Sequence, residues 1–118
     1  MSNQLETSAA LSALSALAHE HRLAVFRLLV QAGPEGMAAG DIADALGLPA
    51  SSMSFHLAHL HRAQLVEQRR DGRSLIYSAA YDAMNALMGY LTENCCGGAP
   101  CGTDVCTPAQ PQPKRSKA

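Results

Sequence analysis

The spacing of apolar residues predicts three short helices before residue 47. Apolar side chains recur at helical intervals in residues 5–17, 20–30 and 38–46. A polar corner separates the first two segments, and the GPEG run at residues 33–36 ends the second. Gly47 is typical of a helix C-terminal cap. The residues expected to face the core are Leu23, Phe26, and Leu29 or Val30 in the second helix, and Ile42, Ala45 and Leu46 in the third.

A fourth helix, which Pro49 is suited to begin, is predicted to have two unlike faces. One face is apolar at helical spacing and carries Met53, Leu57, Leu60 and Ala63. The other carries small hydroxyls, imidazoles and one aromatic ring: Ser51, Ser52, Ser54, Phe55, His56 and His59. Such a face suits contact with base edges and phosphates in a DNA major groove. The third and fourth helices therefore predict a helix-turn-helix whose second helix recognises DNA.

Beyond residue 63 the pattern becomes strand-like and predicts a β-hairpin. Residues 65–70 and 73–78 have the composition of strands, and Asp71-Gly72 is a strong signal for the turn between them. A helix followed at once by a basic hairpin is the layout of a winged helix-turn-helix. We therefore expect a fold that is mainly α with a small β-hairpin.

The last helix is predicted at residues 81–93, with an apolar stripe of Met84, Leu87, Met88 and Leu91. Part of this stripe must be core, but the earlier helices already supply a core. A chain of 118 residues with 47% apolar residues is one small domain, and domains of this size often gain stability by dimerising. We therefore expect a homodimer held through the first and last helices.

The distribution of charge points to nucleic acid, although the formal net charge is only −1. Four arginines lie close together in the sequence: Arg62, Arg69, Arg70 and Arg73. A solvated hairpin face with Glu67 and Asp71 as partners is the alternative, but the preceding helix favours contact with double-stranded DNA. The sequence has no apolar run long enough to span a membrane and no secretion signal at its start, so we expect a cytoplasmic protein without a membrane partner.

The chain changes character after residue 93. All four cysteines follow that point, at Cys95, Cys96, Cys101 and Cys106. The last twelve residues are Pro-rich and then basic, which is typical of disorder. The expected organisation is a winged helix-turn-helix domain for DNA binding and dimerisation at 1–93, a cysteine-rich effector-binding tail at 94–106, and a disordered tail at 107–118.

Two stretches resemble the ArsR/SmtB family of bacterial metal-responsive repressors. LAHEHRLAVFRLL at 17–29 looks like the family's second-helix signature, and residues 40–78 resemble its helix-turn-helix and wing almost throughout. The resemblance covers about residues 9–93 and implies a homodimeric repressor that leaves an inverted-repeat operator when a metal or metalloid binds. On the family pattern the DNA-contacting positions are Ser51, Ser52, Ser54, Phe55 and His56 in the recognition helix, and Arg69, Arg70 and Arg73 in the wing. Phe55 stands where many relatives carry His, and either contacts a thymine methyl group or only packs.

Two of the family's usual sensor sites are missing from this sequence. The Cys-x-Cys box at the start of the third helix is lost, because its positions hold Ala38 and Gly40. The site on the last helix retains Asp82, but residues 83–93 contain no His. For the five histidines, at positions 19, 21, 56, 59 and 61, we expect surface or capping roles. Some arsenical-responsive members of the family carry their ligands just after the last helix, where this chain has its cysteines.

The chemistry of the tail fits trivalent arsenic, which prefers three thiolates in a pyramidal arrangement. Cys95 and Cys96 are adjacent, and the glycines at 97 and 98 let the chain bend so that Cys101 supplies a third sulfur. Cys106 is a weaker candidate that replaces one ligand or remains a spare thiol. We therefore expect arsenite as effector, with antimony(III) or methylarsenite as relatives of the same chemistry.

Other functions of the cysteines remain open at this point. Structural zinc is usually bound by four ligands from paired Cys-x₂₋₄-Cys knuckles, and the adjacent Cys95 and Cys96 fit that spacing poorly. The soft ions Cu(I), Cd(II) and Hg(II) would also bind thiolates. A disulfide switch and a tail without a sensing role are further alternatives. A thiol enzyme such as an arsenate reductase would need an anion-binding loop around a cysteine, which the sequence lacks, so we expect no enzyme. A winged helix used only for protein contacts is disfavoured by the serine-rich helix and the arginine wing.

Overall fold

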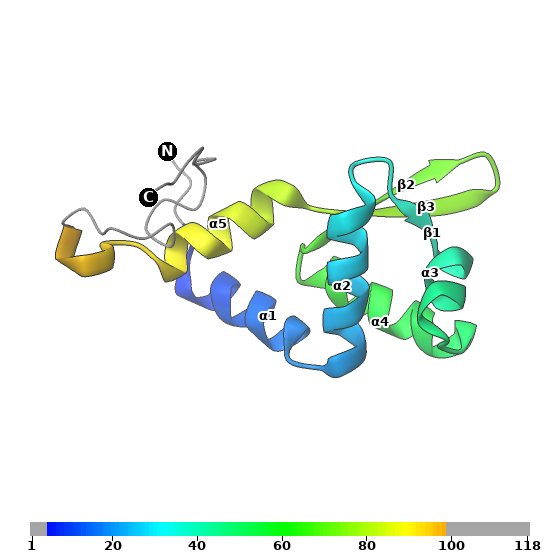
Figure 1. Ribbon diagram of the computed structural model, residues 1–118, viewed down its shortest axis with the longest axis horizontal. Coiled ribbons are helices and arrows are strands. Elements are labelled where there is room, and N and C mark those ends of the chain that lie inside the picture. The colour runs from blue at the N-terminus through cyan, green and yellow to red at the C-terminus, as the bar shows by residue number, and fades with distance from the viewer. Residues whose placement is uncertain (1–4, 99–118) are drawn as a thin grey trace, which may run out of the picture.

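The computed structural model describes residues 5–98, and its elements follow the order of a winged helix-turn-helix (Figure 1). The elements are α1 (Thr7–Leu17), α2 (Glu20–Ala32), β1 (Met37–Ala38), α3 (Ala39–Leu46), α4 (Ala50–Arg62), β2 (Val66–Asp71), β3 (Ser74–Ala79), α5 (Tyr81–Leu91) and the short 3-10 helix η1 (Cys95–Gly98). The expected fold, mainly α with a β-hairpin, is confirmed. Among these elements, no helix is long and apolar enough to cross a membrane.

The hairpin belongs to a three-stranded antiparallel sheet with the order β1-β3-β2, and the sequence had predicted only two of the strands. The unpredicted strand β1 pairs Met37 with Tyr77 and Ala38 with Ile76. The turn was also placed one residue too early, because Asp71 pairs with Ser74 and the loop is Gly72-Arg73. The sheet edge is what gives two residues of β1 an extended conformation, which no local pattern in the sequence announces.

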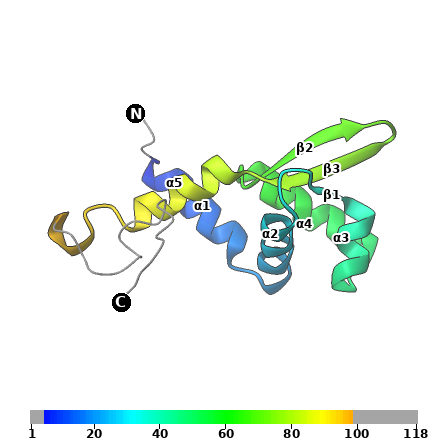
Figure 2. The same cartoon turned by 45° about the horizontal axis from the view of Figure 1, so that its top comes forward.

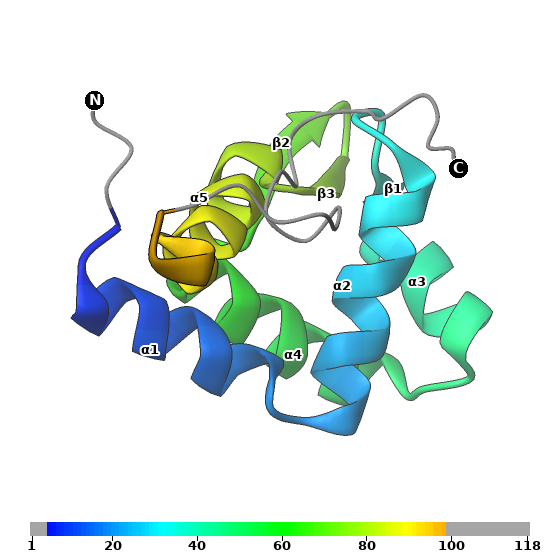
Figure 3. The ribbon, with the colours of Figure 1, turned by 60° about the vertical axis from the view of Figure 1, so that its left-hand side comes forward.

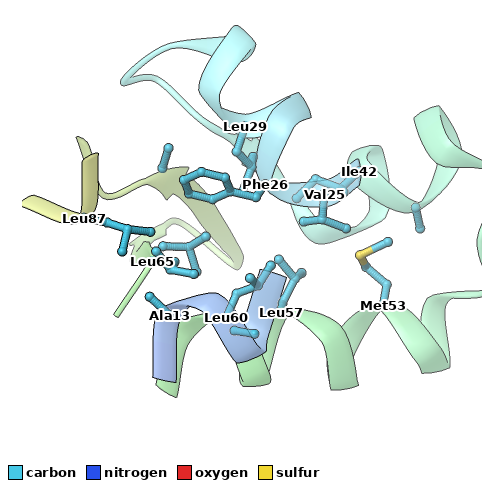
Figure 4. Packing of buried hydrophobic residues seen from close by; sticks show 14 of the residues in the cluster. Ala13, Val25, Phe26, Leu29, Ile42, Met53, Leu57, Leu60, Leu65 and Leu87 are labelled. Carbon is cyan, nitrogen blue, oxygen red and sulfur yellow. The ribbon is translucent and has the colours of Figure 1, made fainter. Parts of the chain in front are cut away.

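One hydrophobic core joins all five helices to the sheet (Figure 4). Its largest fully buried side chains are Leu29, Ile42, Met53, Leu57, Leu60, Leu65 and Val25. Two core predictions were wrong, because Leu23 is 43% exposed and Ala45 is also exposed. Val25 and Ala43 take their places, so the buried faces of α2 and α3 are rotated from the faces we expected.

The buried face of α1 consists of alanines, and two of its leucines, Leu11 and Leu14, point outward. Ala10, Ala13 and Ala16 are buried, whereas Leu11 is 60% and Leu14 is 38% exposed. Small side chains let α1 approach the core closely and leave the large apolar ones available on the outside. Figures 1 and 3 show α1 beside α5, at the opposite end of the molecule from α3.

The two terminal helices are joined by a polar contact as well as by packing. Thr7 Oγ1 and Tyr90 OH are 2.9 Å apart and share a hydrogen bond between the start of α1 and the end of α5. On α5, Leu87 is buried while Met88 is 44% and Leu91 is 54% exposed. The predicted stripe on α5 is therefore divided between core and surface, and the helix ends at Leu91 rather than at residue 93.

Candidate nucleic-acid interface

The turn between α3 and α4 sets the angle of the predicted recognition helix. Gly47 has the left-handed backbone that a C-terminal cap requires, with φ 67° and ψ 33°. Its N–H donates to the Asp44 carbonyl, and the Leu48 N–H donates to the Ala43 carbonyl at 3.0 Å. These two bonds satisfy the last turn of α3, and Pro49 then precedes α4 in extended conformation. Gly47 caps α3 as the sequence predicted, and Pro49 lies one residue before the helix that it was expected to begin.

The inner face of α4 anchors the helix, as expected from its spacing. Met53, Leu57 and Leu60 are each no more than 1% exposed and pack in the core. The outer face carries Ser51, Ser54, Phe55 and Ala58, all exposed. Because residues three and four apart lie on one side of a helix, these four side chains form a single surface stripe. We call these four residues the outer stripe of α4.

The serine hydroxyls of α4 differ in what they can offer a ligand. Ser52 Oγ donates to the Pro49 carbonyl at 3.2 Å, and Ser54 Oγ makes a longer contact of 3.5 Å with the Ala50 carbonyl. Within residues 5–98, Ser51 Oγ makes no hydrogen bond. Ser51 therefore has its proton available for a phosphate or base acceptor, whereas Ser52 presents mainly its lone pairs.

His56 was expected on the polar face of α4, and the structure corrects this placement. The residue is only 6% exposed and its ring packs against two other imidazoles. The ring centroids of His19 and His21 lie 5.0 and 5.6 Å from that of His56. Burial, and then the neighbouring His19 and His21, lower the pKa of His56. A buried ring between α2 and α4 is positioned to hold the recognition helix rather than to enter a groove.

The corner before α2 contains two contacts that the hydrophobic pattern did not predict. His19 Nδ1 accepts from the His21 N–H at 3.1 Å, so His19 is a helix N-cap, in agreement with the capping role expected for a histidine. Arg22 is 9% exposed, and its Nε donates to the Ala16 carbonyl at 2.7 Å. This bond satisfies a carbonyl at the end of α1 and fixes the angle between α1 and α2. An arginine inside an amphipathic segment reads as surface, so its burial had no signal in the spacing.

The wing carries its three arginines in exposed positions. Arg69 Nη2 donates to the Glu35 carbonyl at 2.9 Å, which ties the hairpin to the loop before β1. Because side chains alternate along a strand, Arg70 points from the opposite face of β2, and Arg73 lies at the tip of the hairpin. Figure 2 shows this hairpin extending away from the helices. Within residues 5–98, Arg69 is thus the wing arginine that makes a hydrogen bond to the protein, whereas the guanidinium groups of Arg70 and Arg73 make none.

The predicted sensor begins directly behind α5. Cys95 and Cys96 lie in η1, and their Sγ atoms are 3.7 Å apart. Cys95 N–H donates to the Thr92 carbonyl at 3.0 Å, and Thr92 Oγ1 donates to the Met88 carbonyl at 2.8 Å, so hydrogen bonds connect the cysteine pair to the last turn of α5. Cys101 and Cys106 lie outside the described residues. Among residues 5–98 no group of three His, Cys, Asp or Glu side chains could hold a metal ion.

Known proteins match both the sequence and the fold of this chain. Residues 17–69 match the family described as "Helix-turn-helix domain". The HTH-type transcriptional regulator YgaV of Escherichia coli is 35% identical over 95 residues, which span 79% of this chain and 94% of that protein.

Among the solved structures with a similar fold, two illustrate the likeness. NolR from Sinorhizobium fredii is 37% identical with a TM-score of 0.59, covering 73% of this chain and 83% of that one. A homodimeric winged helix-turn-helix DNA-binding domain from Mycobacterium bovis, described as a possible ArsR-family regulator, is 29% identical with a TM-score of 0.57 and covers 84% and 96%. The described elements, their order and these matches agree, and the chain belongs to the ArsR-like family of helix-turn-helix transcriptional regulators.

Proposed function

We propose that this protein is a cytoplasmic, homodimeric repressor that leaves its operator when trivalent arsenic binds its C-terminal thiolates. The observation that carries the proposal is the position of the cysteine pair. Cys95 and Cys96 directly follow one of the two helices that expose apolar side chains for a partner subunit, and their sulfurs lie 3.7 Å apart. The proposed effector ligands therefore lie next to the helix that would contact the partner subunit.

The dimer forms through α1 and α5. Four large apolar side chains are exposed on these helices, Leu11, Leu14, Met88 and Leu91, and we call them the seam. The M. bovis neighbour is described as homodimeric, which supports the same assembly here. A two-fold dimer presents two copies of α4 to successive major grooves about 34 Å apart. Ser51, Ser52, Ser54 and Phe55, with Arg69, Arg70 and Arg73 from the wing, are the proposed DNA contacts.

The sulfur spacing fits a shared soft atom. Two thiolates bound at about 2.3 Å to one tetrahedral zinc ion lie about 3.8 Å apart. The Sγ atoms of Cys95 and Cys96, which are disulfide-bonded here, are 3.7 Å apart, so after reduction the two sulfurs could share one atom at nearly the same spacing. Arsenite would take Cys95 and Cys96 as two ligands and Cys101 as the third, with Cys106 able to replace one of them. Antimony(III) fits the same set, and methylarsenite needs only two of the sulfurs. The identity of the effector is therefore proposed from the thiolates that would bind it, and binding involves no catalytic step.

Coupling to DNA runs through the end of α5. The Cys95, Thr92 and Met88 hydrogen bonds continue the helix into η1, and Tyr90 joins the same turn to α1. Drawing three thiolates together reshapes the segment next to the seam, and a changed dimer angle separates the two copies of α4 from their grooves. Releasing the operator by a factor of about 10⁴ requires about 5.5 kcal/mol of differential affinity, and operator DNA must weaken effector binding by the same factor.

The decisive experiment is anisotropy of a labelled fragment from upstream of the gene, titrated with reduced protein and then with arsenite. Wild-type protein should bind and be released. Cys95→Ser, Cys96→Ser and Cys101→Ser should bind and stay bound, and Cys106→Ser should still be released. If arsenite leaves the wild type on DNA, the effector is wrong and the repressor stands. If no fragment is bound in a sequence-dependent way, the repressor is wrong as well.

A second candidate is redox sensing through the same cysteines, because Cys95 and Cys96 are both disulfide-bonded in the structure. In that case each disulfide forms when two thiols lose two electrons and two protons to an oxidant such as hydrogen peroxide, which is reduced to two waters. The same titration distinguishes the two candidates. Peroxide without arsenite should release a redox sensor, whereas an arsenic sensor kept reduced should respond to arsenite alone. Cadmium and zinc arms test the other soft metals.

A further inference from the structure

Phe55 is the large side chain of the proposed DNA-binding face. It is 61% exposed, the highest value among the exposed large apolar residues of the described chain. The other members of the outer stripe of α4 are two serines and an alanine. A phenylalanine ring among side chains this short projects farther than they do. It is therefore placed to reach the floor of a groove that accepts α4.

The exposed ring of Phe55 contacts two histidine rings edge-on. It meets the His56 ring edge-on at 5.8 Å between centroids, with the planes inclined by 63°. It meets the His59 ring at 6.4 Å and 84°. Edge-to-face contacts of this kind are favourable for aromatic rings. Because His56 is itself buried between α2 and α4, the ring of Phe55 is supported from the protein interior while its outer surface stays open.

The chemistry of the ring limits what it can recognise. Phe55 has no hydrogen-bond donor or acceptor, so it gains nothing from a phosphate or from a polar base edge. In the major groove the apolar feature is the C5-methyl group of thymine, which apolar side chains contact. The exposed apolar residues of the seam lie on α1 and α5, so Phe55 is separate from the surface assigned to the second subunit.

We propose that Phe55 reads the 5-methyl group of one thymine in each half of the operator. This inference rests on the proposed function, because it requires α4 to enter the major groove. Of the two roles that the sequence allowed for Phe55, contact with a thymine methyl group or packing alone, it selects the first. The methyl group then contributes to the sequence specificity of operator binding. The polar contacts of Ser51 and the wing arginines would then position the helix, and the ring would select the base step.

The test replaces thymine by deoxyuridine, which removes the methyl group and keeps base pairing. An operator is first selected from a random DNA library with the reduced full chain, and each thymine is then exchanged singly. In each half-site, exchange of one particular thymine should weaken wild-type binding about fourfold. This factor corresponds to about 0.8 kcal/mol for one buried methylene-sized group. Exchange in both half-sites together should weaken binding about sixteenfold.

Variants assign the effect to the ring. Phe55→Ala should bind the thymine and deoxyuridine operators equally, with only a small fall in melting temperature, because the ring is 61% exposed and loses only its contacts with His56 and His59. Phe55→Leu should retain part of the discrimination. Leu23→Ala, which removes an exposed apolar side chain from α2, should keep the full ratio.

Two results overturn the inference. One is that no single exchange weakens wild-type binding, and the other is that the ratio persists in Phe55→Ala. Either result leaves sequence-specific binding intact, so the repressor would stand without this contact. Failure to select any sequence from the library would instead overturn the repressor together with the contact.

Discussion

The two ends of this molecule expose different kinds of side chain. The α1–α5 end exposes four large apolar residues. The other end, with α3, the outer stripe of α4 and the wing, exposes serines, an alanine, a single aromatic ring and arginines. Apolar area is suited to burial against another protein surface, which offers equally apolar groups. Short polar side chains and arginines suit a groove lined by hydrogen-bonding edges and phosphates. The comparison separates a surface for assembly from a surface for recognition.

The largest expected effect comes from disrupting the seam on α1 and α5, and with it the proposed dimer. Leu91→Asp places a charge in the seam at a residue that is 54% exposed in one subunit. We expect a monomer that loses the second copy of α4 and binds the operator about 100-fold more weakly or worse, because avidity from linked sites contributes at least that factor. Sedimentation and anisotropy measure the two changes. Leu23→Asp, a comparable exposed site on α2, should leave both unchanged; equal losses in the two variants would contradict the seam.

The next effect concerns the stability of the sheet at Gly36, which lies against Tyr77 and Ile76 of β3. Gly36 has φ +74°, and an added Cβ would overlap the Tyr77 carbonyl oxygen and touch Ile76 Cγ2 at 3.0 Å. Gly36→Ala should lower the free energy of unfolding by about 3 kcal/mol, since a left-handed non-glycine costs about 1–3 kcal/mol before any overlap. Chemical denaturation measures it. Gly40→Ala on α3, where nothing lies within 4 Å, should stabilise by about 0.5–1 kcal/mol.

The histidine cluster behind α4 predicts a dependence on pH. Burial lowers the pKa of His56, and His19, His21, Arg22 and His59 lower it further as positive neighbours. An unfolded chain titrates its histidines near about 6.5, so it binds more protons than the native state as the pH falls through that value. Native stability is therefore present above that pH and decreases below it, until the lowered native pKa is passed.

Comparing unfolding at pH 7.5 and 5.5 checks this sign. His56→Gln should flatten the loss of stability on acidification, because its amide does not titrate. His61→Gln, at an exposed site on the same helix, serves as the matched control and should retain the wild-type profile. A profile that is equally steep in His56→Gln and the wild type would contradict the cluster as the origin.

The smallest effect concerns the junction between α4 and β2. Gln64 has φ 66°, its N–H donates to the His61 carbonyl at 2.9 Å, and the Leu65 N–H donates to the Leu60 carbonyl at 3.0 Å. This is the capping pattern in which glycine is usually found. Gln64→Gly should stabilise the fold by about 1 kcal/mol, observed as a higher melting temperature. Gln64→Ala retains a Cβ in the same conformation and should give no such gain.

Much of the recognition end could be predicted from sequence because its signals are local. The spacing of Met53, Leu57 and Leu60 identified the buried face of α4, and Gly47 with Pro49 identified the turn before it. The Asp-Gly dipeptide located the hairpin to within one residue. The cysteines were found from composition alone, although the structure describes only Cys95 and Cys96.

Where the sequence did not indicate a side chain's burial or exposure, the deciding neighbours lie outside that residue's own helix. His56 is polar and was assigned to the surface, but the N-terminus of α2 covers it with two further imidazoles. Arg22 is buried because the end of α1 offers it a carbonyl at 2.7 Å. On α1, Ala10, Ala13 and Ala16 face the core, whereas Leu11 and Leu14 lie on the outer surface of that helix.

Local chemistry thus determined the helices, the turn, the hairpin and the thiol-rich tail, since periodicity, capping residues and side-chain type act over a few neighbouring positions. Only tertiary packing decided which polar groups are buried and which apolar groups remain exposed. A side chain's solvent exposure is a property of everything packed around it. In this protein, tertiary packing buries His56, which supports the recognition helix, and leaves Phe55, one residue earlier, exposed on the outer face.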